Sequence, residues 1–318
     1  MPGTTEDDVP TLAGRTALVT GATSGVGRRV AEGLVRRGTR TLLACRDVDA
    51  AAVVAAQLRA ATPGARVEVV HLDLADLRSV SAAVDDVAAV LDAPGATGLD
   101  VLVNNAGVMA VPHREVTAQG HELQLGVNHL GHVALTAGLL PQLRRRPGAR
   151  VVTVTSSVHH RAQLALDDLE SERRYRAWAA YGQSKLANVL FAVELQRRSD
   201  AGGWGLLSTS AHPGLCRTRL ARGGPLQGGV QPLAPIVLVG TAILGQSDRQ
   251  GARPVLHAAT AADVVGGGCY GPRWLFGWRG PPGPVTPSRW ALDEQLAAWL
   301  WTRSEELTGV AFPAVSAP

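Results

Sequence analysis

The chain has 318 residues, and 46% of them are hydrophobic, so it can bury the core of one large α/β domain. Its formal charge of +4 comes mostly from arginines dispersed among alanines, and it contains no long basic run that would indicate a nucleic-acid-binding protein. The three cysteines are too few and too widely spaced for a disulfide framework or a metal motif. We therefore expect a single domain with a small-molecule partner and no nucleic-acid partner.

The N-terminal residues 1–12 are acidic, contain proline and include no apolar run. We expect no signal peptide and a cytoplasmic protein. The most apolar window, residues 235–244, is shorter than the roughly 20 residues that span a bilayer. This window is expected to be buried or to form part of a lid, and no membrane span is predicted.

From residue 15 onward, short apolar segments alternate with amphipathic segments of helical length. Strands are expected at residues 16–20, 40–44, 66–71, 99–103, 150–155 and 206–211. Helices are expected at residues 25–37, 48–61, 77–91, 121–143 and 179–198. This alternation predicts a doubly wound α/β fold, in which a parallel sheet is covered on both faces.

A glycine-rich turn at residues 20–27 separates the first expected strand from the first expected helix. A turn in this position places backbone N–H groups and the positive end of the helix against a pyrophosphate. Its spacing, Gly-x-x-x-Gly-x-Gly, is one residue longer than the common Rossmann fingerprint. A plain tight turn is the alternative, but the strand before it and the helix after it favour a dinucleotide.

Tyr181 and Lys185 lie four positions apart in an expected helix, and therefore on one face of it. A free phenol has a pKa of about 10 and exchanges protons slowly at neutral pH. An ammonium group beside it favours the phenolate and lowers the pKa of the phenol toward the working range. A surface pair without function is the alternative, and other motifs must decide.

These motifs occur in a fixed order along the chain: the turn at residues 20–27, Asn-Asn-Ala-Gly at residues 104–107, Asn128, Ser156-Ser157 and Tyr181-x-x-x-Lys185. Together they resemble the short-chain dehydrogenase/reductase family over roughly residues 14–270. Within it, the chain resembles the branch of retinol dehydrogenases and protochlorophyllide reductases at residues 104–108, 126–132, 156–160, 181–191 and 212–218. The resemblance implies one Rossmann-type domain over residues 1–318 with strand order 3-2-1-4-5-6-7. It also implies a substrate lid at about residues 219–250 and a C-terminal helical extension at residues 271–318.

The family's catalytic residues match Asn128, Ser157, Tyr181 and Lys185. By this resemblance Tyr181 is the general acid or base, and Lys185 lowers its pKa and holds the nicotinamide ribose. Ser157 would hold the substrate oxygen, and Asn128 would support a helix and a water-borne proton path to the lysine. The 23 residues between Ser157 and Tyr181 leave the choice between Ser156 and Ser157 open.

The resemblance also implies a set of contacts to NADP(H). The glycine-rich turn would bind the pyrophosphate, and the other contacts would hold the adenine, the ribose and the nicotinamide carboxamide. The implied residues are Gly21, Thr23, Ser24, Gly25, Val26, Gly27, Arg46, Asp73, Leu74, Asn105, Ala106, Gly107, Tyr181, Lys185, Pro213, Gly214 and Thr218. Capping of the next helix is the alternative for Asp73, and a simple turn is the alternative for Gly214.

The preference for NADP rests on the end of the second expected strand. An acid at this position prefers NAD, because it accepts a hydrogen bond from the ribose 2′-hydroxyl and repels a 2′-phosphate. This chain has Cys45 there and Arg46 next, and a guanidinium can bind a phosphate. Asp47 could pair with Arg46, although it is better placed to cap the next helix.

Histidine pairs occur at His129 and His132 and at His159 and His160. No third ligand with zinc spacing accompanies either pair, so no metal site is expected. His159 and His160 lie just beyond the serines and are expected at the rim of the substrate pocket.

The remaining segments are less regular. Residues 161–178 insert a charged segment between serine and tyrosine, and we expect a surface helix there. Residues 272–287 are rich in Pro, Gly and Trp and are expected to form no regular element. Residues 290–307 predict a terminal amphipathic helix, whose apolar face comprises Leu292, Leu296, Trp299 and Leu300.

The sequence therefore predicts an NADP-dependent carbonyl reductase or alcohol dehydrogenase that acts on a largely apolar small molecule. Redox-neutral chemistry or C=C reduction on the same fold is one alternative. A non-catalytic NADP-binding sensor or scaffold is another, and an intact set of Ser157, Tyr181 and Lys185 argues against it. The sequence is compatible with a homodimer or homotetramer and does not determine the oligomeric state.

Overall fold

A computed structural model of the chain describes residues 11–93, 97–215 and 246–315. Within these residues the strands are β1 (Thr16–Thr20), β2 (Arg40–Cys45), β3 (Val67–His71), β4 (Val101–Asn104), β5 (Arg150–Val154), β6 (Leu207–Ala211), β7 (Cys269–Trp274) and β8 (Arg279–Pro284). They form one sheet in the order β3-β2-β1-β4-β5-β6-β7-β8. The expected strand order is confirmed, and β8 extends it by one antiparallel strand.

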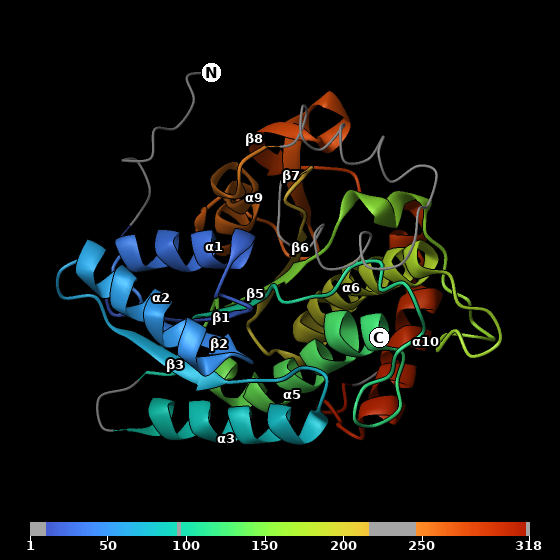
Figure 1. Cartoon of the computed structure of the whole chain (residues 1–318), viewed down its shortest axis with the longest axis horizontal. Coiled ribbons are helices and arrows are strands. Elements are labelled where there is room, and N and C mark those ends of the chain that lie inside the picture. Colours follow the sequence, from blue (N-terminus) through green and yellow to red (C-terminus); the bar gives the residue numbers. More distant parts are fainter. Residues whose placement is uncertain (1–10, 94–96, 216–245, 316–318) are drawn as a thin grey trace.

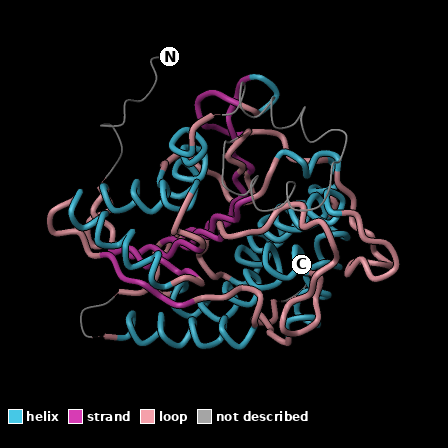
Figure 2. Tube along the Cα trace, viewed as in Figure 1, coloured by secondary structure: helices cyan, strands magenta, loops and turns pink. Residues whose placement is uncertain are grey.

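Helices cover both faces of this sheet (Figures 1 and 2). The α-helices are α1 (Gly25–Arg36), α2 (Val48–Ala61), α3 (Leu77–Asp92), α4 (Leu123–Leu125), α5 (Gly131–Arg144), α6 (Ala177–Gly202), α9 (Asp248–Thr260) and α10 (Glu294–Thr308). Helices α1, α2 and α9 share one buried cluster with the sheet, and α3, α5 and α6 share another on the opposite face. The doubly wound fold is thus confirmed.

The central strand β1 shows why the strands are continuous apolar runs. Ala17 and Val19 belong to the core beneath α1, whereas Leu18 belongs to the core beneath α3 and α5. Successive side chains of a strand point to opposite faces of the sheet, and here both faces are covered. No described helix is long and apolar enough to cross a membrane.

The expected helix at residues 121–143 is divided in the structure. It consists of α4, the π-helix η2 (Gly126–Leu130) and α5. A π-helix is rare and is frequently found at functional sites, because it turns a side chain out of the regular helical register. Asn128 lies within this π-helix and is buried.

The charged insert at residues 161–178 is not a surface helix, which corrects the prediction. It follows the 3-10 helix η3 (Ser157–Arg161) and runs as a loop to the start of α6. The Asp168 carboxylate accepts hydrogen bonds from the backbone N–H groups of Glu172, Arg173 and Arg174. These N–H groups would otherwise need helical partners, so the carboxylate stabilises a non-helical path.

The prediction that residues 272–287 form no regular element is also wrong. β7 continues to Trp274, and β8 pairs with it in antiparallel register, with Pro282 opposite Pro272. β8 is an edge strand, where a missing N–H donor leaves no neighbouring strand unpaired. The 3-10 helix η4 (Leu275–Gly277) closes this hairpin.

The terminal helix is confirmed, but its buried face differs from the predicted one. A short 3-10 helix, η5 (Arg289–Leu292), precedes α10, and Leu292 is 62% exposed. Leu300 is buried as predicted, whereas Trp301 lies inward and stacks on Phe191 of α6 with ring centroids 5.5 Å apart. Leu296 and Trp299 also pack against the core as predicted, so only Leu292 departs from the predicted face, and Trp301 extends it.

Candidate active site

The glycine-rich turn after β1 packs against the segment that follows β4. The Thr20 hydroxyl oxygen accepts from the backbone N–H groups of Asn105 and Ala106, each at 2.9 Å. A Cβ on Gly21 would lie 2.9 Å from the Ala106 Cα, and one on Gly27 would lie 2.3 Å from the Asn105 Nδ2. Both glycines are therefore required by a close approach between two motifs that are far apart in sequence.

The N-terminus of α1 is open to an anion. Its N-cap residue, Ser24, makes no capping bond through its side chain, and the first turn contains no acidic residue. The first N–H groups of a helix have no partner within the helix, and the helix dipole adds positive potential there. This end of α1 fits the pyrophosphate of a dinucleotide.

The end of β2 carries the residues predicted to select the cofactor. Cys45 is buried, and burial raises the pKa of its thiol, although backbone N–H groups of the glycine-rich turn oppose the rise. Asp47 caps α2, because its carboxylate accepts from the Ala50 N–H at 2.9 Å. Arg46 is exposed and forms no ion pair with any described residue. The predicted capping role of Asp47 is confirmed.

Asp73 does not cap the next helix, so that alternative is wrong. The N-cap of α3 is Asp76, which accepts from the Arg78 N–H at 3.0 Å. The Oδ1 of the Asp73 carboxylate instead accepts from the Ala75 N–H at 2.9 Å. Leu74 is buried against α5, where a Cβ on Gly131 would lie 2.7 Å from the Leu74 carbonyl oxygen.

Asn128 joins three elements of the site. Its Oδ1 accepts from the Val108 N–H at 2.8 Å, and its Nδ2 lies 2.9 Å from both the Val108 carbonyl oxygen and the Ser184 Oγ. A Cβ on Gly107 would lie 2.8 Å from the Asn128 Oδ1 and 3.4 Å from the Lys185 Nζ. The amide therefore links the segment after β4 to α6, one residue before the lysine.

Tyr181 and Lys185 lie on one buried face of α6. The Lys185 Nζ is 5.8 Å from the centre of the Tyr181 ring and donates to the Val154 carbonyl at 3.3 Å. Burial raises the pKa of Tyr181 to about 12 and lowers the pKa of Lys185 to about 8. The change for Tyr181 is opposite to the expected direction, because desolvation disfavours the charged forms of both residues.

The two serines have different surroundings. The Ser156 side chain hydrogen-bonds to Tyr181 and opposes the rise of the tyrosine's pKa. It is also the N-cap of η3, whereas Ser157 is the first residue of that helix. Both are half-buried at the carboxyl end of β5.

The segment after β6 contains Pro213 and Gly214. The Gly214 N–H donates to the His212 Nδ1 at 3.3 Å, and the Gln246 Nε2 donates to the Pro213 carbonyl at 2.5 Å. Gly214 has a φ of +72°, which favours glycine. Thr218 and most of the expected lid lie outside the described residues, and the last lid residues form the first turn of α9.

Sequence reasoning missed the role of Thr20 and His132. The Thr20 hydroxyl lies 2.9 Å from the His132 Nε2, and the His132 Nδ1 donates to the Asn128 carbonyl at 3.1 Å. Burial lowers the pKa of His132 to about 3, so the ring is neutral and accepts from Thr20. One hydrogen-bonded chain thus connects the glycine-rich turn to Asn128. The only sequence signal was a threonine at a buried strand end.

Histidines and acids do not gather into a metal site in the described part of the chain. No group of three or more His, Cys, Asp or Glu residues there could hold a metal ion. His129 instead hydrogen-bonds through Nε2 to the Ser304 hydroxyl of α10 at 2.8 Å. The other histidine of that sequence pair, His132, lies in the hydrogen-bonded chain between Thr20 and Asn128.

Comparison with known proteins agrees with this arrangement. The sequence profile of the short chain dehydrogenases matches residues 15–224. Retinol dehydrogenase 13 from Homo sapiens is 37% identical over 312 residues, which cover 96% of this chain and 88% of that protein. A crystal structure of an uncharacterised protein from Mycobacterium paratuberculosis has a TM-score of 0.78 and 41% identity, covering 98% of this chain and 100% of that one.

A further solved structure contains the cofactor. The Pseudomonas aeruginosa RhlG/NADP active-site complex has a TM-score of 0.62 and 25% identity, covering 81% of this chain and 94% of that chain. The fold and the ordered set of motifs define a dinucleotide-dependent oxidoreductase. The chain belongs to the short-chain dehydrogenase/reductase family.

Proposed function

We propose that this protein transfers a hydride between NADP(H) and a carbonyl or alcohol group of a largely apolar small molecule. The buried Tyr181 and Lys185 pair supports this proposal best, because it places a phenol and an amine side by side at the carboxyl ends of the parallel strands. The retinol dehydrogenase relative is named for an apolar alcohol. NADP(H), when bound, supplies or accepts the hydride.

The residues of the chain divide the remaining work. Tyr181 gives a proton to the carbonyl oxygen in reduction and takes it back in oxidation. Ser157 holds the same oxygen, and Lys185 holds the nicotinamide ribose and favours the phenolate. Asn128 fixes the segment after β4 against α6, so that the lysine stays beside the tyrosine.

The surroundings of the tyrosine also support an apolar substrate. Trp178 packs edge-on against Tyr181, with ring centroids 6.0 Å apart. An apolar wall excludes water from the point where the hydride moves. It also provides contact area for an apolar substrate.

The test is a panel of aldehydes and ketones, including retinal and short soluble carbonyls, incubated with NADPH or NADH and followed at the nicotinamide absorbance. Turnover of apolar carbonyls with NADPH supports the proposal. Binding of NADPH without turnover of any carbonyl would instead favour a sensor or scaffold, and oxidation of NADPH by a conjugated C=C substrate alone would favour the second enzyme class.

A further inference from the structure

The hairpin formed by β7 and β8 carries large apolar side chains in water. Trp274 is 64% exposed, Leu275 is 56% exposed and Trp278 is 41% exposed. Figure 1 shows this hairpin in orange at the end of the sheet, with its turn at the periphery of the molecule. We call residues 273–279, Arg-Trp-Leu-Phe-Gly-Trp-Arg, the hairpin tip.

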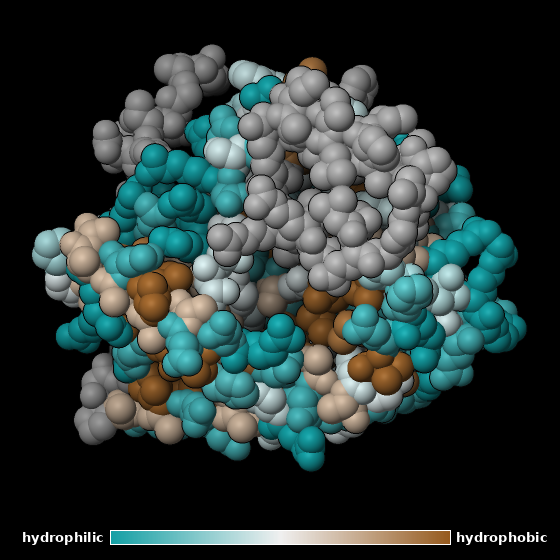
Figure 3. Space-filling model, in the orientation of Figure 1, coloured by the Kyte–Doolittle hydropathy of each residue, from teal (hydrophilic) through white to brown (hydrophobic). Residues whose placement is uncertain are grey.

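The backbone of the hairpin tip is also unusual. Leu275 has a φ of +49°, in the left-handed region that a glycine or asparagine adopts at lower cost. Exposure of the leucine side chain to water is unfavourable, and a leucine in the left-handed region of the backbone is also energetically costly. Among the coloured residues on the face shown in Figure 3, hydrophobic residues form several separate patches between hydrophilic ones. The hairpin tip therefore combines three exposed apolar side chains with a costly turn.

Two arginines flank the apolar side chains. Arg273 and Arg279 are exposed, and neither forms an ion pair with any described residue. The sequence contains no Asp or Glu from residue 264 to residue 292, so no acid neutralises them locally. The stem of Arg273 crosses Gly283 of β8, where a Cβ would lie 2.5 Å from its Cδ. An arginine stem laid along apolar surface with its charge at the rim suits an interface between lipid and water.

The backbone of the hairpin tip packs beside one segment of the candidate active site. The Leu215 N–H donates to the Trp278 carbonyl at 3.2 Å, and a Cβ on Gly214 would lie 2.6 Å from the same oxygen. A Cβ on Gly277 would lie 3.3 Å from the His212 ring. The tip is therefore packed on the segment that carries Pro213 and Gly214, at the carboxyl end of β6.

We propose that the hairpin tip inserts into the headgroup region of a membrane that contains anionic lipid. Tryptophan prefers the boundary between water and hydrocarbon, because its ring is apolar and its N–H is polar. Arg273 and Arg279 supply the complementary charge for anionic headgroups. Docking in this way places the segment after β6 at the lipid surface, where an apolar substrate would be dissolved; this last step rests on the proposed function.

A second copy of the chain suits the hairpin tip less well. A stable interface buries about 800 Å² on each partner, whereas a tryptophan contributes only about 150 to 250 Å² when fully covered. Two partly exposed tryptophans and one leucine do not reach this area. Two unneutralised arginines would also face each other across a symmetric contact.

Co-sedimentation of the full chain with lipid vesicles tests the proposal directly. The vesicles consist of phosphatidylcholine alone or of phosphatidylcholine with about one third phosphatidylserine. Trp274→Ser with Trp278→Ser should weaken binding to the anionic vesicles by at least about 10-fold, because the buried apolar area is lost. Arg273→Gln with Arg279→Gln should weaken it by roughly 30-fold, since each basic residue near such a surface contributes about a factor of 5.

Matched controls lie elsewhere on the surface. Val53→Ser removes an exposed apolar residue of α2, and Arg144→Gln removes an exposed arginine of α5. Both should bind vesicles as the wild type does. Circular dichroism and turnover of a short, water-soluble carbonyl show that the tip variants remain folded and that their loss is confined to vesicle binding.

Three outcomes would overturn the proposal. The first is a wild type that binds neither kind of vesicle. The second is a set of tip variants that bind vesicles as well as the wild type does. The third is a set of tip variants that change the oligomeric state in light scattering without affecting vesicle binding. Vesicle binding needs no turnover, so failure of the proposed reaction would show separately in the carbonyl assay.

Discussion

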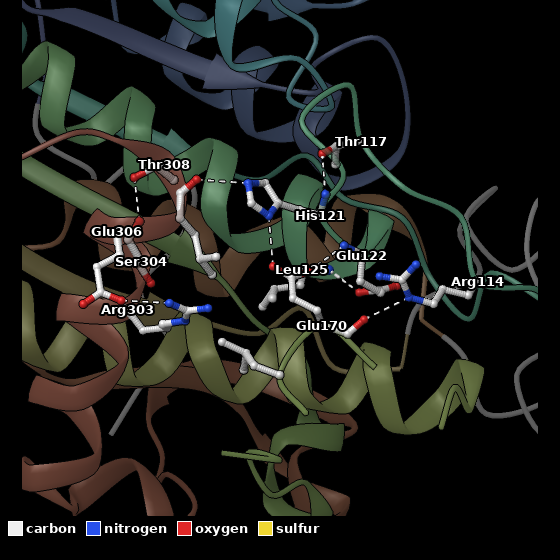
Figure 4. A network of polar contacts seen from close by, with 12 residues as sticks. Arg114, Thr117, His121, Glu122, Leu125, Glu170, Arg303, Ser304, Glu306 and Thr308 are labelled. Atoms are coloured by element: carbon white, nitrogen blue, oxygen red, sulfur yellow. Dashed lines mark hydrogen bonds and ion pairs between the residues drawn. The ribbon is translucent and has the colours of Figure 1, made fainter. Parts of the chain in front are cut away.

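The His121 Nδ1 lies 2.9 Å from the Glu170 Oε1, in the polar network that Figure 4 shows. The His121 Nε2 lies 3.0 Å from the Leu307 carbonyl oxygen. Both neighbours are acceptors, so both ring nitrogens must carry a hydrogen to satisfy them. The hydrogen bond to Glu170 is the main cause that raises the pKa of His121. The ring thus bridges the insert of residues 161–178 and the C-terminal helix, and it satisfies both acceptors when it is protonated.

This contact makes part of the stability depend on pH. The pKa of His121 is raised in the folded state, so its contribution is complete below the unfolded pKa of about 6.5 and is lost as pH rises through the folded value. The free energy of unfolding of the wild type should exceed that of His121→Gln by about 1 to 2 kcal/mol at about pH 6, and by less at about pH 8.5. Urea unfolding at both pH values measures the difference.

His71→Gln is the matched control, because His71 is an exposed histidine whose side chain makes no hydrogen bond with the described residues. The control should follow the wild type at both pH values. Equal differences between wild type and His121→Gln at the two pH values would show that the charge of the ring is not involved.

Tyr181→Phe should remove turnover and leave NADPH binding nearly intact, because only the proton donor is lost. General acid catalysis is worth a factor of about 10² to 10⁴, so kcat should fall by that factor. Tyr175→Phe is the control, because Tyr175 is a neighbouring tyrosine whose pKa is also raised to about 12 and whose hydroxyl donates to the Val111 carbonyl at 2.6 Å. The Tyr175→Phe variant should have a lower free energy of unfolding and keep most of the wild-type kcat. A Tyr181→Phe variant with more than about a tenth of the wild-type rate would contradict the role.

The two serines should give different signatures. Ser157→Ala should lower kcat by about 10-fold or more without moving the pH dependence, because its hydroxyl is proposed to hold the substrate oxygen. Ser156→Ala should move the pH limb that reports Tyr181 to higher pH, because the Ser156 hydrogen bond opposes the rise of that pKa. Profiles of kcat/KM against pH separate the two. The reverse pattern would assign the catalytic role to Ser156.

Much of the fold was predictable because it is locally encoded. The glycine-rich turn, the end of β2 and the start of α2 follow from residues adjacent in sequence, and the predicted range of α2 matches the structure at both ends. The position of Tyr181 relative to Lys185 needs only helical geometry. The family resemblance then supplied the strand order, which short-range patterns do not contain.

The remaining features depend on contacts between distant residues. The bond from Thr20 to His132 spans 112 positions, and no local pattern announces it. The π-helix contains Asn128, whose amide bonds to Val108 and Ser184, residues that are distant from it in sequence. The pairing of β8 was missed because its prolines are unfavourable in a strand interior and acceptable only at an edge. Whether a strand is an edge strand is a property of the whole sheet.

The choice of dinucleotide provides the last prediction. Arg46 is exposed at the end of β2 and forms no ion pair with a described residue, because Asp47 is used to cap α2. A hydrogen bond to a charged group contributes roughly 1.5 to 3 kcal/mol, so Arg46→Ala should weaken NADPH binding by roughly 10-fold to 150-fold. NADH lacks the 2′-phosphate, and its binding should change little. Arg66→Ala is the control, since Arg66 is an exposed arginine just before β3, at the amino ends of the parallel strands, whereas Arg46 follows the carboxyl end of the neighbouring strand β2. Fluorescence titration of both cofactors against the three proteins decides the matter, and a wild type that binds NADH as tightly as NADPH would contradict the prediction.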